Sequence, residues 1–264
     1  MELGSEEIQS LVQGYAKLTP SQRRRVGFLI THFQKPKRYW RSTSSDLITS
    51  EVLDIFGDYL LMHNVNSSHP LDKAQFEYAF EMALKEAGLS VALAPSRTNP
   101  GYDIAIGGVR VSLKTEGSRD IKANEIHISK WMELGKGEWV LPELRDRFLD
   151  HLSQYDRVLV LRNVAKTPVE MHHELVEIPV ALMREAASCT FTSARSKQKP
   201  PPGRGAVTDT NGKTRFVLYF DGGSERKLQV QHIDKNLCIL HATWEFISTA
   251  SGQSSSSQLP IAFV

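Results

Sequence analysis

Pro100 to Glu116 read Pro-Gly-Tyr-Asp-Ile-Ala-Ile-Gly-Gly-Val-Arg-Val-Ser-Leu-Lys-Thr-Glu, and this stretch predicts a β-hairpin. Two short apolar runs flank Gly107-Gly108, and a glycine pair in that setting is typical of a two-residue hairpin turn. Asp103 stands where the first strand begins. Because side chains alternate between the two faces of a strand, one face of the second strand carries Arg110, Ser112, Lys114 and Glu116. The hairpin therefore brings an acid and a lysine together on neighbouring strands.

An acid and a lysine on adjacent strands suit the hydrolysis of a phosphodiester. A carboxylate at Asp103 can hold a divalent cation, which polarises the phosphate and lowers the pKa of a bound water. An ammonium at Lys114 can orient that water or neutralise the negative charge that grows on the phosphate oxygens. The alternative is an ordinary hairpin whose Asp103 and Lys114 face solvent.

The pattern resembles the PD-(D/E)xK nuclease superfamily, and most of all its type II restriction endonucleases. In that family an acid opens one strand, and the next strand ends in an acid, any residue and a lysine. Asp103 matches the first acid, Lys114 the lysine and Leu113 the residue between them. Two positions depart from the pattern, because two residues separate the proline from the aspartate and Ser112 stands where the second acid is usual. The resemblance implies Mg²⁺ as cofactor, double-stranded DNA as substrate, and a homodimer with two catalytic sites in a bacterial restriction–modification system.

Three glutamates are candidates for the missing carboxylate. Glu116 lies on the same predicted strand face as the lysine, and it ranks first because it needs the simplest geometry. Glu125 lies on the helix predicted to follow the hairpin, from which certain restriction enzymes with serine at the second position draw a glutamate. Glu77 lies on a helix predicted from Leu71 to Gly88, and the resemblance implies that this helix brings a carboxylate to the metal. We expect metal ligands among Asp103, Glu116, Glu77 and the backbone carbonyl of Leu113.

The composition excludes several classes of protein. The sequence has no run of about 18 apolar residues that would span a bilayer and no secretory signal at its start, so we expect no membrane partner and a cytoplasmic, intracellular location. Cys189 and Cys238 are too few and too far apart for a zinc site. A net charge of +2 argues against a histone-like polycation.

Basic residues gather in two stretches. From Ser21 to Arg41 the chain has no acid, and its basic residues, which include Arg38, are interleaved with aromatic ones. A second basic run surrounds Pro200-Pro201-Pro202. Such runs fit contacts to phosphates, where each neutralised phosphate releases counterions, although a solvated helix face gives the same pattern. We expect Arg38 and Lys130 to contact the DNA backbone.

Hydrophobic periodicity predicts an α/β core, with a central mixed sheet flanked by helices and preceded by a helical layer. Arg157 to Val164 is the strongest strand signal, because a nearly continuous apolar run is typical of a strand covered on both faces. The other predicted elements are two helices between Glu6 and Phe33 broken at Thr19-Pro20, a third helix from Ser45-Asp46, a strand from Leu89 to Ala94, helices from Ala123 to Leu134, Leu141 to Leu152 and Pro179 to Ala187, and a strand from Glu174 to Ile178.

The C-terminal part has a different character. A Ser/Lys/Pro/Gly-rich linker from Thr190 to Gly205 precedes three predicted antiparallel strands, Arg215 to Phe220, Arg226 to Ile233 and Leu237 to Ile247. A two-stranded ribbon fits the major groove, where Gln pairs with adenine and Arg or Lys with guanine. The base-reading candidates are Arg226, Lys227, Gln229 and Gln231, although any half-exposed strand shows the same polar alternation.

Four regions follow from this pattern. They are a helical region for DNA grip or dimerisation (1–70), a catalytic core (71–188), a linker with an antiparallel β segment for DNA recognition (189–250) and a flexible serine-rich tail (251–264). The leading hypothesis is a sequence-specific, Mg²⁺-dependent DNA endonuclease of the type II restriction kind. The alternatives are the same core used in repair or recombination, and a DNA-binding module without catalysis.

Overall fold

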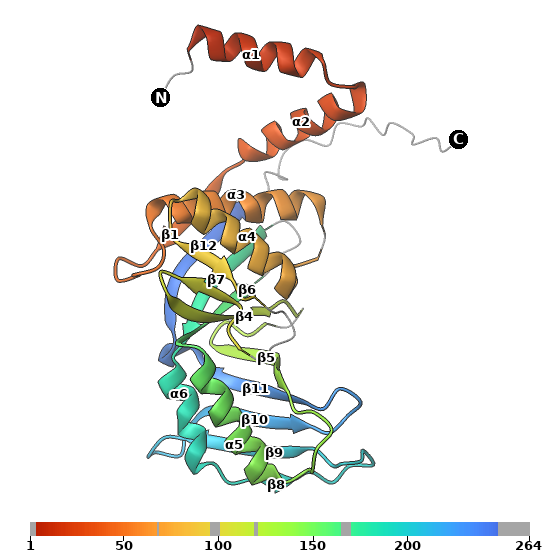
Figure 1. Ribbon diagram of the computed structural model, residues 1–264, viewed down its shortest axis with the longest axis vertical. Coiled ribbons are helices and arrows are strands. Elements are labelled where there is room, and N and C mark those ends of the chain that lie inside the picture. Colours follow the sequence, from red (N-terminus) through yellow and green to blue (C-terminus); the bar gives the residue numbers. More distant parts are fainter. Residues whose placement is uncertain (1–3, 68, 96–100, 119–120, 165–169, 248–264) are drawn as a thin grey trace, which may run out of the picture.

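The predicted hairpin lies in a mixed sheet of seven strands, in the order β1-β12-β7-β6-β4-β3-β2 (Figure 1). The computed structural model describes residues 4–67, 69–95, 101–118, 121–164 and 170–247, so Pro100 and the predicted tail lie outside the described residues. β4 and β6 run parallel, and the other neighbours in this sheet are antiparallel. The strands are β1 (Lys37–Arg41), β2 (Val91–Leu93), β3 (Ile104–Ile106), β4 (Val109–Glu116), β6 (Arg157–Asn163), β7 (Glu170–Ile178) and β12 (Ile239–Ile247).

A second sheet of five antiparallel strands has the order β5-β11-β10-β9-β8. It lies at the far end of the molecule from the N-terminal helices (Figure 1). Its strands are β5 (Glu125–Glu133), β8 (Thr192–Ser193), β9 (Gly203–Thr208), β10 (Thr214–Asp221) and β11 (Lys227–Asp234).

Three of the helices begin at a side-chain N-cap, which is Thr19, Thr49 or Asp72. In α4, the Asp72 side chain accepts a hydrogen bond from Gln75 N while the Gln75 side chain accepts one from Asp72 N, which satisfies two N–H groups that the helix leaves unpaired. No helix in the described part of the chain is long and apolar enough to cross a membrane. The helices are α1 (Ser5–Ala16), α2 (Pro20–Phe33), α3 (Ser50–Asn66), α4 (Lys73–Glu86), α5 (Leu141–His151) and α6 (Val180–Arg184), with 3₁₀ turns η1 (Leu152–Gln154), η2 (Glu185–Ser188) and η3 (Lys235–Leu237).

Two apolar cores lie on opposite faces of the larger sheet. Leu159 and Leu161 of β6 pack with α3 and α4 in one core, and Val158 and Val160 pack with α5, α6 and the five-stranded sheet in the other. A strand that is covered on both faces is a continuous apolar run, as the sequence of β6 predicts. The predicted mixed α/β fold is confirmed.

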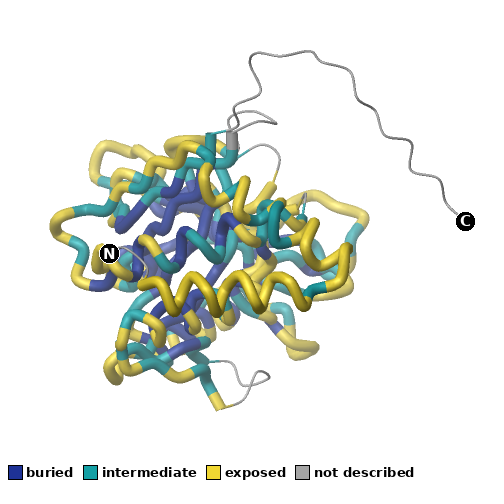
Figure 2. Tube along the Cα trace, turned by 90° about the horizontal axis from the view of Figure 1, so that it is seen from above, coloured by how far each residue is buried: buried dark blue, intermediate teal, exposed yellow. Residues whose placement is uncertain are grey.

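The first two helices contribute nothing to either core. α1 and α2 have no buried residue, and they project from the body of the molecule (Figure 1). Viewed from above, α1 is exposed along its length while the sheet beneath is buried (Figure 2). Among its apolar side chains, Ile8, Leu11 and Val12 are 48%, 59% and 63% exposed.

The helix expected from Ala123 to Leu134 is wrong, because this segment forms β5. Ile126 and Ile128 are buried while His127 and Ser129 between them are exposed, so the segment has the two-residue period of a strand. Pairing with β11 stabilises this conformation. A local apolar pattern that fits a helix was therefore overridden by a tertiary partner.

Other boundaries also differ from the predictions. The third helix starts at Ser50, because Thr49 and not Asp46 provides the N-cap, accepting from Val52 N. The linker predicted between Thr190 and Gly205 contains β8 and the start of β9. β10 and β11 pair as expected, but β12 joins the seven-stranded sheet between β1 and β7.

Candidate active site

The hairpin turn places Asp103 beside the second strand. Gly107 and Gly108 have φ of +55° and +87°, the left-handed region that a tight hairpin turn requires and glycine adopts most readily. Asp103 N donates to Val111 O, and Asp103 O accepts from Ala94 N, at 2.9 Å each. Asp103 is therefore held by its own backbone between β2 and β4.

The Asp103 carboxylate lies against β4. Its Oδ2 accepts hydrogen bonds from Leu113 N at 2.6 Å and from Ser112 Oγ at 3.1 Å, and Ser112 Oγ accepts from Lys114 Nζ at 2.9 Å. The structure thus brings the predicted acid and lysine together, with the serine of the second-acid position between them. A serine here links the two charges without adding a negative one.

Lys114 is a buried cation, with 7% of its surface exposed. Burial, and to a lesser extent the charge of Lys73, lower the pKa of Lys114 to about 8, although Asp103 and Glu77 oppose this change. His151 at the end of α5 has its pKa lowered to about 4, by burial first and then by the Lys114 charge. The sequence analysis did not identify His151, because its position follows from how α5 packs.

α4 adds a second carboxylate and a second lysine to this group. Lys73 Nζ donates to Asp103 Oδ1 at 2.7 Å and lies 3.3 Å from Glu77 Oε1. Glu77 is therefore brought to Asp103 through an ammonium that touches both. The sequence analysis missed Lys73, although its spacing of four residues from Glu77 on a predicted helix was a signal for an ion pair.

Glu116 is directed elsewhere by a buried arginine. Its Oε2 accepts from Arg162 Nε at 2.6 Å and its Oε1 from His127 N at 2.8 Å. Arg162 is 0% exposed and also binds Glu174 through Nη1 at 2.7 Å. Both carboxylate oxygens of Glu116 therefore accept hydrogen bonds from residues outside the Asp103 group.

Glu125 also lies apart from the Asp103 group. Its carboxylate accepts from His232 Nδ1 at 2.7 Å and from Lys122 Nζ at 3.1 Å. Hydrogen bonds from His232 and then Lys122 lower the pKa of Glu125. Of the three candidate glutamates, Glu77 is the one that contacts the group containing Asp103 and Lys114 within the described part of the chain.

The possible metal ligands of this group are carboxylates, the donors that hard divalent cations prefer. Within the described residues, no group of three or more His, Cys, Asp or Glu side chains is placed to hold a metal ion. Asp103 and Glu77 offer two carboxylates that already share one cation, the Lys73 ammonium. Mg²⁺ typically binds one or two carboxylates and completes its shell with water and substrate phosphate, so a pair of this kind is sufficient.

The base-reading candidates lie on one face of the five-stranded sheet. Leu228 and Val230 of β11 are buried in the core, while Lys227, Gln229 and Gln231 alternate with them on the other face. Gln231 Nε2 donates to Gln229 Oε1 at 2.9 Å. β11 is thus an interior strand with neighbours on both sides, not part of an isolated ribbon.

The remaining basic candidates already have partners within the chain. Arg226, with φ of +39°, donates to Gly137 O at 2.9 Å and lies over the Trp139 ring. Lys130 pairs with Glu133 at 2.8 Å, and Lys227 with Glu225 at 3.1 Å. Arg38 on β1 is exposed and lies 3.8 Å from Glu245.

A cleft of about 900 Å³ joins two of these residues. Lys130 and Arg226 line it, and it lies among the turns at one end of the five-stranded sheet. Its other lining residues are Glu133, Gly135, Lys136, Gln198, Lys199, Gly222, Gly223, Ser224 and Glu225. Basic side chains therefore outnumber acidic ones in this cleft, which lies next to β11, the strand predicted to read bases.

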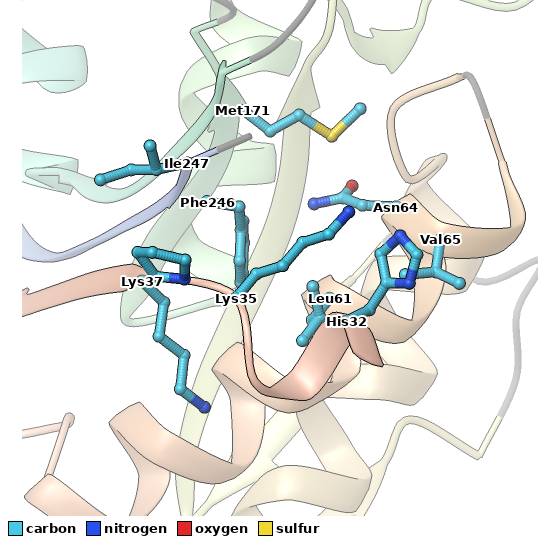
Figure 3. A pocket seen from close by; sticks show the side chains of 10 residues that line it. His32, Lys35, Lys37, Leu61, Asn64, Val65, Met171, Phe246 and Ile247 are labelled. Carbon is cyan, nitrogen blue, oxygen red and sulfur yellow. The ribbon is translucent and has the colours of Figure 1, made fainter. Parts of the chain in front are cut away.

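A second cavity, of about 230 Å³, lies where α2 meets β1 and α3. Leu61, Val65 and Phe246 give it an apolar wall, and Lys35 extends across it towards Asn64, whereas Lys37 points away (Figure 3). None of its lining residues belongs to the Asp103 group. It is separate from the candidate catalytic residues.

Comparisons with known proteins agree with this geometry. A family model named SmaI, described as a type II site-specific deoxyribonuclease, matches residues 13–246, which include the hairpin, α4 and both sheets. The type II restriction enzyme SmaI of Serratia marcescens is 46% identical over 212 residues, covering 80% of this chain and 86% of that enzyme. The chain therefore belongs to the SmaI family of type II site-specific deoxyribonucleases and is a DNA endonuclease.

Proposed function

We propose that this restriction endonuclease hydrolyses DNA by Mg²⁺-assisted attack of water at a site formed by Asp103, Glu77 and Lys114. The observation that supports this site is the chain of contacts Lys114–Ser112–Asp103, which Lys73 extends to Glu77. It joins two carboxylates to a buried cation at the edge of one sheet.

Asp103 and Glu77 would hold the metal, with the Leu113 carbonyl as a further ligand, since the Leu113 peptide already contacts Asp103. The metal supplies a polarised phosphate and a water of lowered pKa. Lys114 provides a fixed positive charge in a site that water scarcely reaches. There it orients the attacking water or stabilises the negative charge on phosphorus oxygens, which a preorganised donor does strongly in a buried site.

Glu116 has a supporting role in this proposal. Because its carboxylate is bound by Arg162 and by the His127 amide, it fixes the end of β4 two residues beyond Lys114. Glu77 takes the place of the second carboxylate that the serine at position 112 cannot provide.

We further propose that DNA contacts the outer face of the five-stranded sheet. Gln229 and Gln231 would read base edges, and Lys227, Lys130 and Arg226 would lie near phosphates at the end where the cationic cleft opens. Arg38 would add a phosphate contact from β1. Side chains on a strand can read the major groove in this manner.

Two copies of the chain would act together, because one catalytic group per chain must cut two antiparallel DNA strands. The exposed apolar side chains of α1 and α2 support this proposal. α1 carries Glu6 and Glu7, and α2 carries Arg23, Arg24 and Arg25. α1 of one copy would lie against α2 of the other, with apolar sides facing and charges matched.

We propose that the protein acts in the bacterial cytoplasm, because its substrate is DNA. The relative that matches over most of the chain comes from a bacterium, Serratia marcescens.

A plasmid digest tests the proposal. With Mg²⁺ the protein should give discrete fragments, and EDTA should abolish them. Asp103→Ala and Lys114→Ala should each lower the cleavage rate at least about hundredfold, with DNA binding in Ca²⁺ retained. Full activity of either variant would refute the assignment of that residue.

A further inference from the structure

Lys73 lies at the place where the proposed metal ligands face each other. Its ammonium nitrogen is 2.7 Å from Asp103 Oδ1 and 3.3 Å from Glu77 Oε1. A cation of the chain itself therefore already neutralises the two carboxylates to which we assign the metal.

The ammonium and a divalent metal ion cannot both keep these contacts. Mg²⁺ binds oxygen at about 2.0–2.1 Å, so an ion on Asp103 Oδ1 would lie close to a nitrogen that is hydrogen bonded to the same oxygen. Two positive centres at that separation repel strongly in a partly buried site. One must leave before the other binds.

Lys73 is the group that is free to leave. Its side chain is 45% exposed, whereas the side chains of Asp103 and Glu77 are 15% and 16% exposed. Lys114, the other lysine of the group, lies on β4 and is 7% exposed, so it is less free to move than Lys73.

The charges of the group also sum to zero in this arrangement, since two lysines face two carboxylates. Entry of a divalent ion would leave the site with two excess positive charges, and a DNA phosphate brings a negative one. A lysine that is released from the carboxylates is attracted towards that phosphate.

We propose that the Lys73 ammonium is a placeholder, which competes with the divalent cation for Asp103 and Glu77 in the DNA-free enzyme. The inference rests on the proposed function, because it takes these two residues as the metal ligands. Its consequence is that the free enzyme binds the metal weakly, and that DNA strengthens binding by drawing the ammonium away.

The test measures metal binding by the full chain without DNA. Mn²⁺ is added to wild type, Lys73→Met and Lys73→Arg, and free Mn²⁺ is measured by electron paramagnetic resonance. Lys73→Met should bind Mn²⁺ about tenfold more tightly, which corresponds to about 1.4 kcal/mol, and Lys73→Arg should stay close to wild type.

Lys85→Met is the matched control. Lys85 pairs with Glu81 at 2.8 Å, also four residues apart on α4, and is 49% exposed, but its ion pair is with Glu81 and not with the Asp103 group. Its removal should leave Mn²⁺ affinity unchanged. Thermal unfolding of each variant checks that α4 is intact.

Asp103→Asn separates the two ways in which the idea can fail. If Asp103→Asn loses Mn²⁺ binding while Lys73→Met gains nothing over wild type, the metal site holds and the placeholder is wrong. If Asp103→Asn binds Mn²⁺ as wild type does, the proposed metal site itself is wrong. Absence of any gain in Lys73→Met, including no binding by either protein, overturns the inference.

Discussion

At the scale of single residues, two glutamates that are both candidate metal ligands in the sequence have different surroundings in the structure. Glu77 shares a cation with Asp103, whereas Glu116 is bound to Arg162. The strand pattern alone places Glu116 on the same face as Lys114, and it does not reveal that an arginine on a neighbouring strand binds it. An ion pair across strands depends on which strands become neighbours.

These surroundings predict opposite effects for two equivalent substitutions. Glu77→Gln should lower Mg²⁺-dependent cleavage by at least about hundredfold and change stability little, because Glu77 lies on a helix surface. Glu116→Gln should instead destabilise the fold, because it leaves the Arg162 charge buried with one partner fewer. Cleavage rates across Mg²⁺ concentrations and urea unfolding distinguish the two. If the cleavage rates of both variants lose their dependence on Mg²⁺ equally, Glu116 is a metal ligand as well.

Because His173 on β7 is buried, we expect the folded protein to lose stability as the pH falls. It is 1% exposed, its Nδ1 has no hydrogen-bond partner among the described residues, and its Nε2 accepts from Asn64 Nδ2 at 3.1 Å. Burial, followed by the charges of His172 and His63, lowers the pKa of His173 to about 3. The unfolded chain, with a His pKa of about 6.5, binds this proton first as the pH falls. The free energy of unfolding therefore decreases from about pH 6.5 down to about pH 3.

At pH 5 this decrease is about 2 kcal/mol. Urea unfolding of His173→Leu at pH 7 and pH 5 should show a loss smaller than that of wild type by this amount. His69, which is exposed, supplies the control, and His69→Leu should lose as much as wild type. An unchanged loss in His173→Leu would show that this histidine is charged in the folded protein.

At the scale of elements, Arg162 connects the two sheets. From β6 it binds Glu116 on β4 and Glu174 on β7, and its Nη2 donates to the carbonyls of Lys122 and Glu125 at 2.8 Å each. Burial would raise the pKa of Glu174, but hydrogen bonds from His172 and Lys235 and the charge of Arg162 lower it to about 2. Lys122 and Glu125, where β5 begins, are thus bound by a side chain of β6 that also binds β4 and β7.

Arg162→Met should lower the free energy of unfolding by about 3–5 kcal/mol, since it leaves the buried Glu116 carboxylate without its cation and leaves Glu174 with Lys235 alone. Arg110→Met, on β4, is the comparison. Arg110 and Asp156 form a pair whose side chains are 41% and 47% exposed, and such solvent-exposed pairs contribute little to stability. Urea unfolding at pH 7 measures both, and similar losses would contradict the role of Arg162.

The sequence predicts well those elements whose signal lies within a few neighbouring residues. The hairpin turn has its two glycines, α4 has Asp72 as cap, and β6 has its apolar run. β5 and β12 were misplaced because their conformation or their neighbours depend on distant strands. β5 needs β11, and β12 needs β1 and β7.

At the scale of the whole molecule, the exposed α1–α2 arm predicts how copies associate. Leu11→Glu, at the centre of the α1 apolar stripe, should convert the proposed dimer of 29.7 kDa chains into monomers. Because a monomer cuts one strand at a time, its plasmid digest should accumulate nicked circles. Gln13→Glu, on the opposite side of α1, should remain dimeric.

Sedimentation equilibrium measures these masses. A monomeric wild type, or a dimeric Leu11→Glu, would contradict the arm as the interface. The proposed division into four regions stays a prediction, although β12 ties the segment before residue 250 to the sheet that carries the catalytic hairpin.

The position of β12 between β1 and β7 has a consequence for biosynthesis. β1 ends at Arg41, and its partner begins at Ile239, so a growing polypeptide must be extended as far as β12 before β1 is paired. Trp244, which is fully buried and donates from Nε1 to Leu53 O on α3, is synthesised at the same late stage. Contacts so distant in sequence slow folding. A nascent or prematurely terminated chain that stops before β12 therefore lacks the strand that joins β1 to β7, and the nuclease completes its larger sheet only after β12 has been translated.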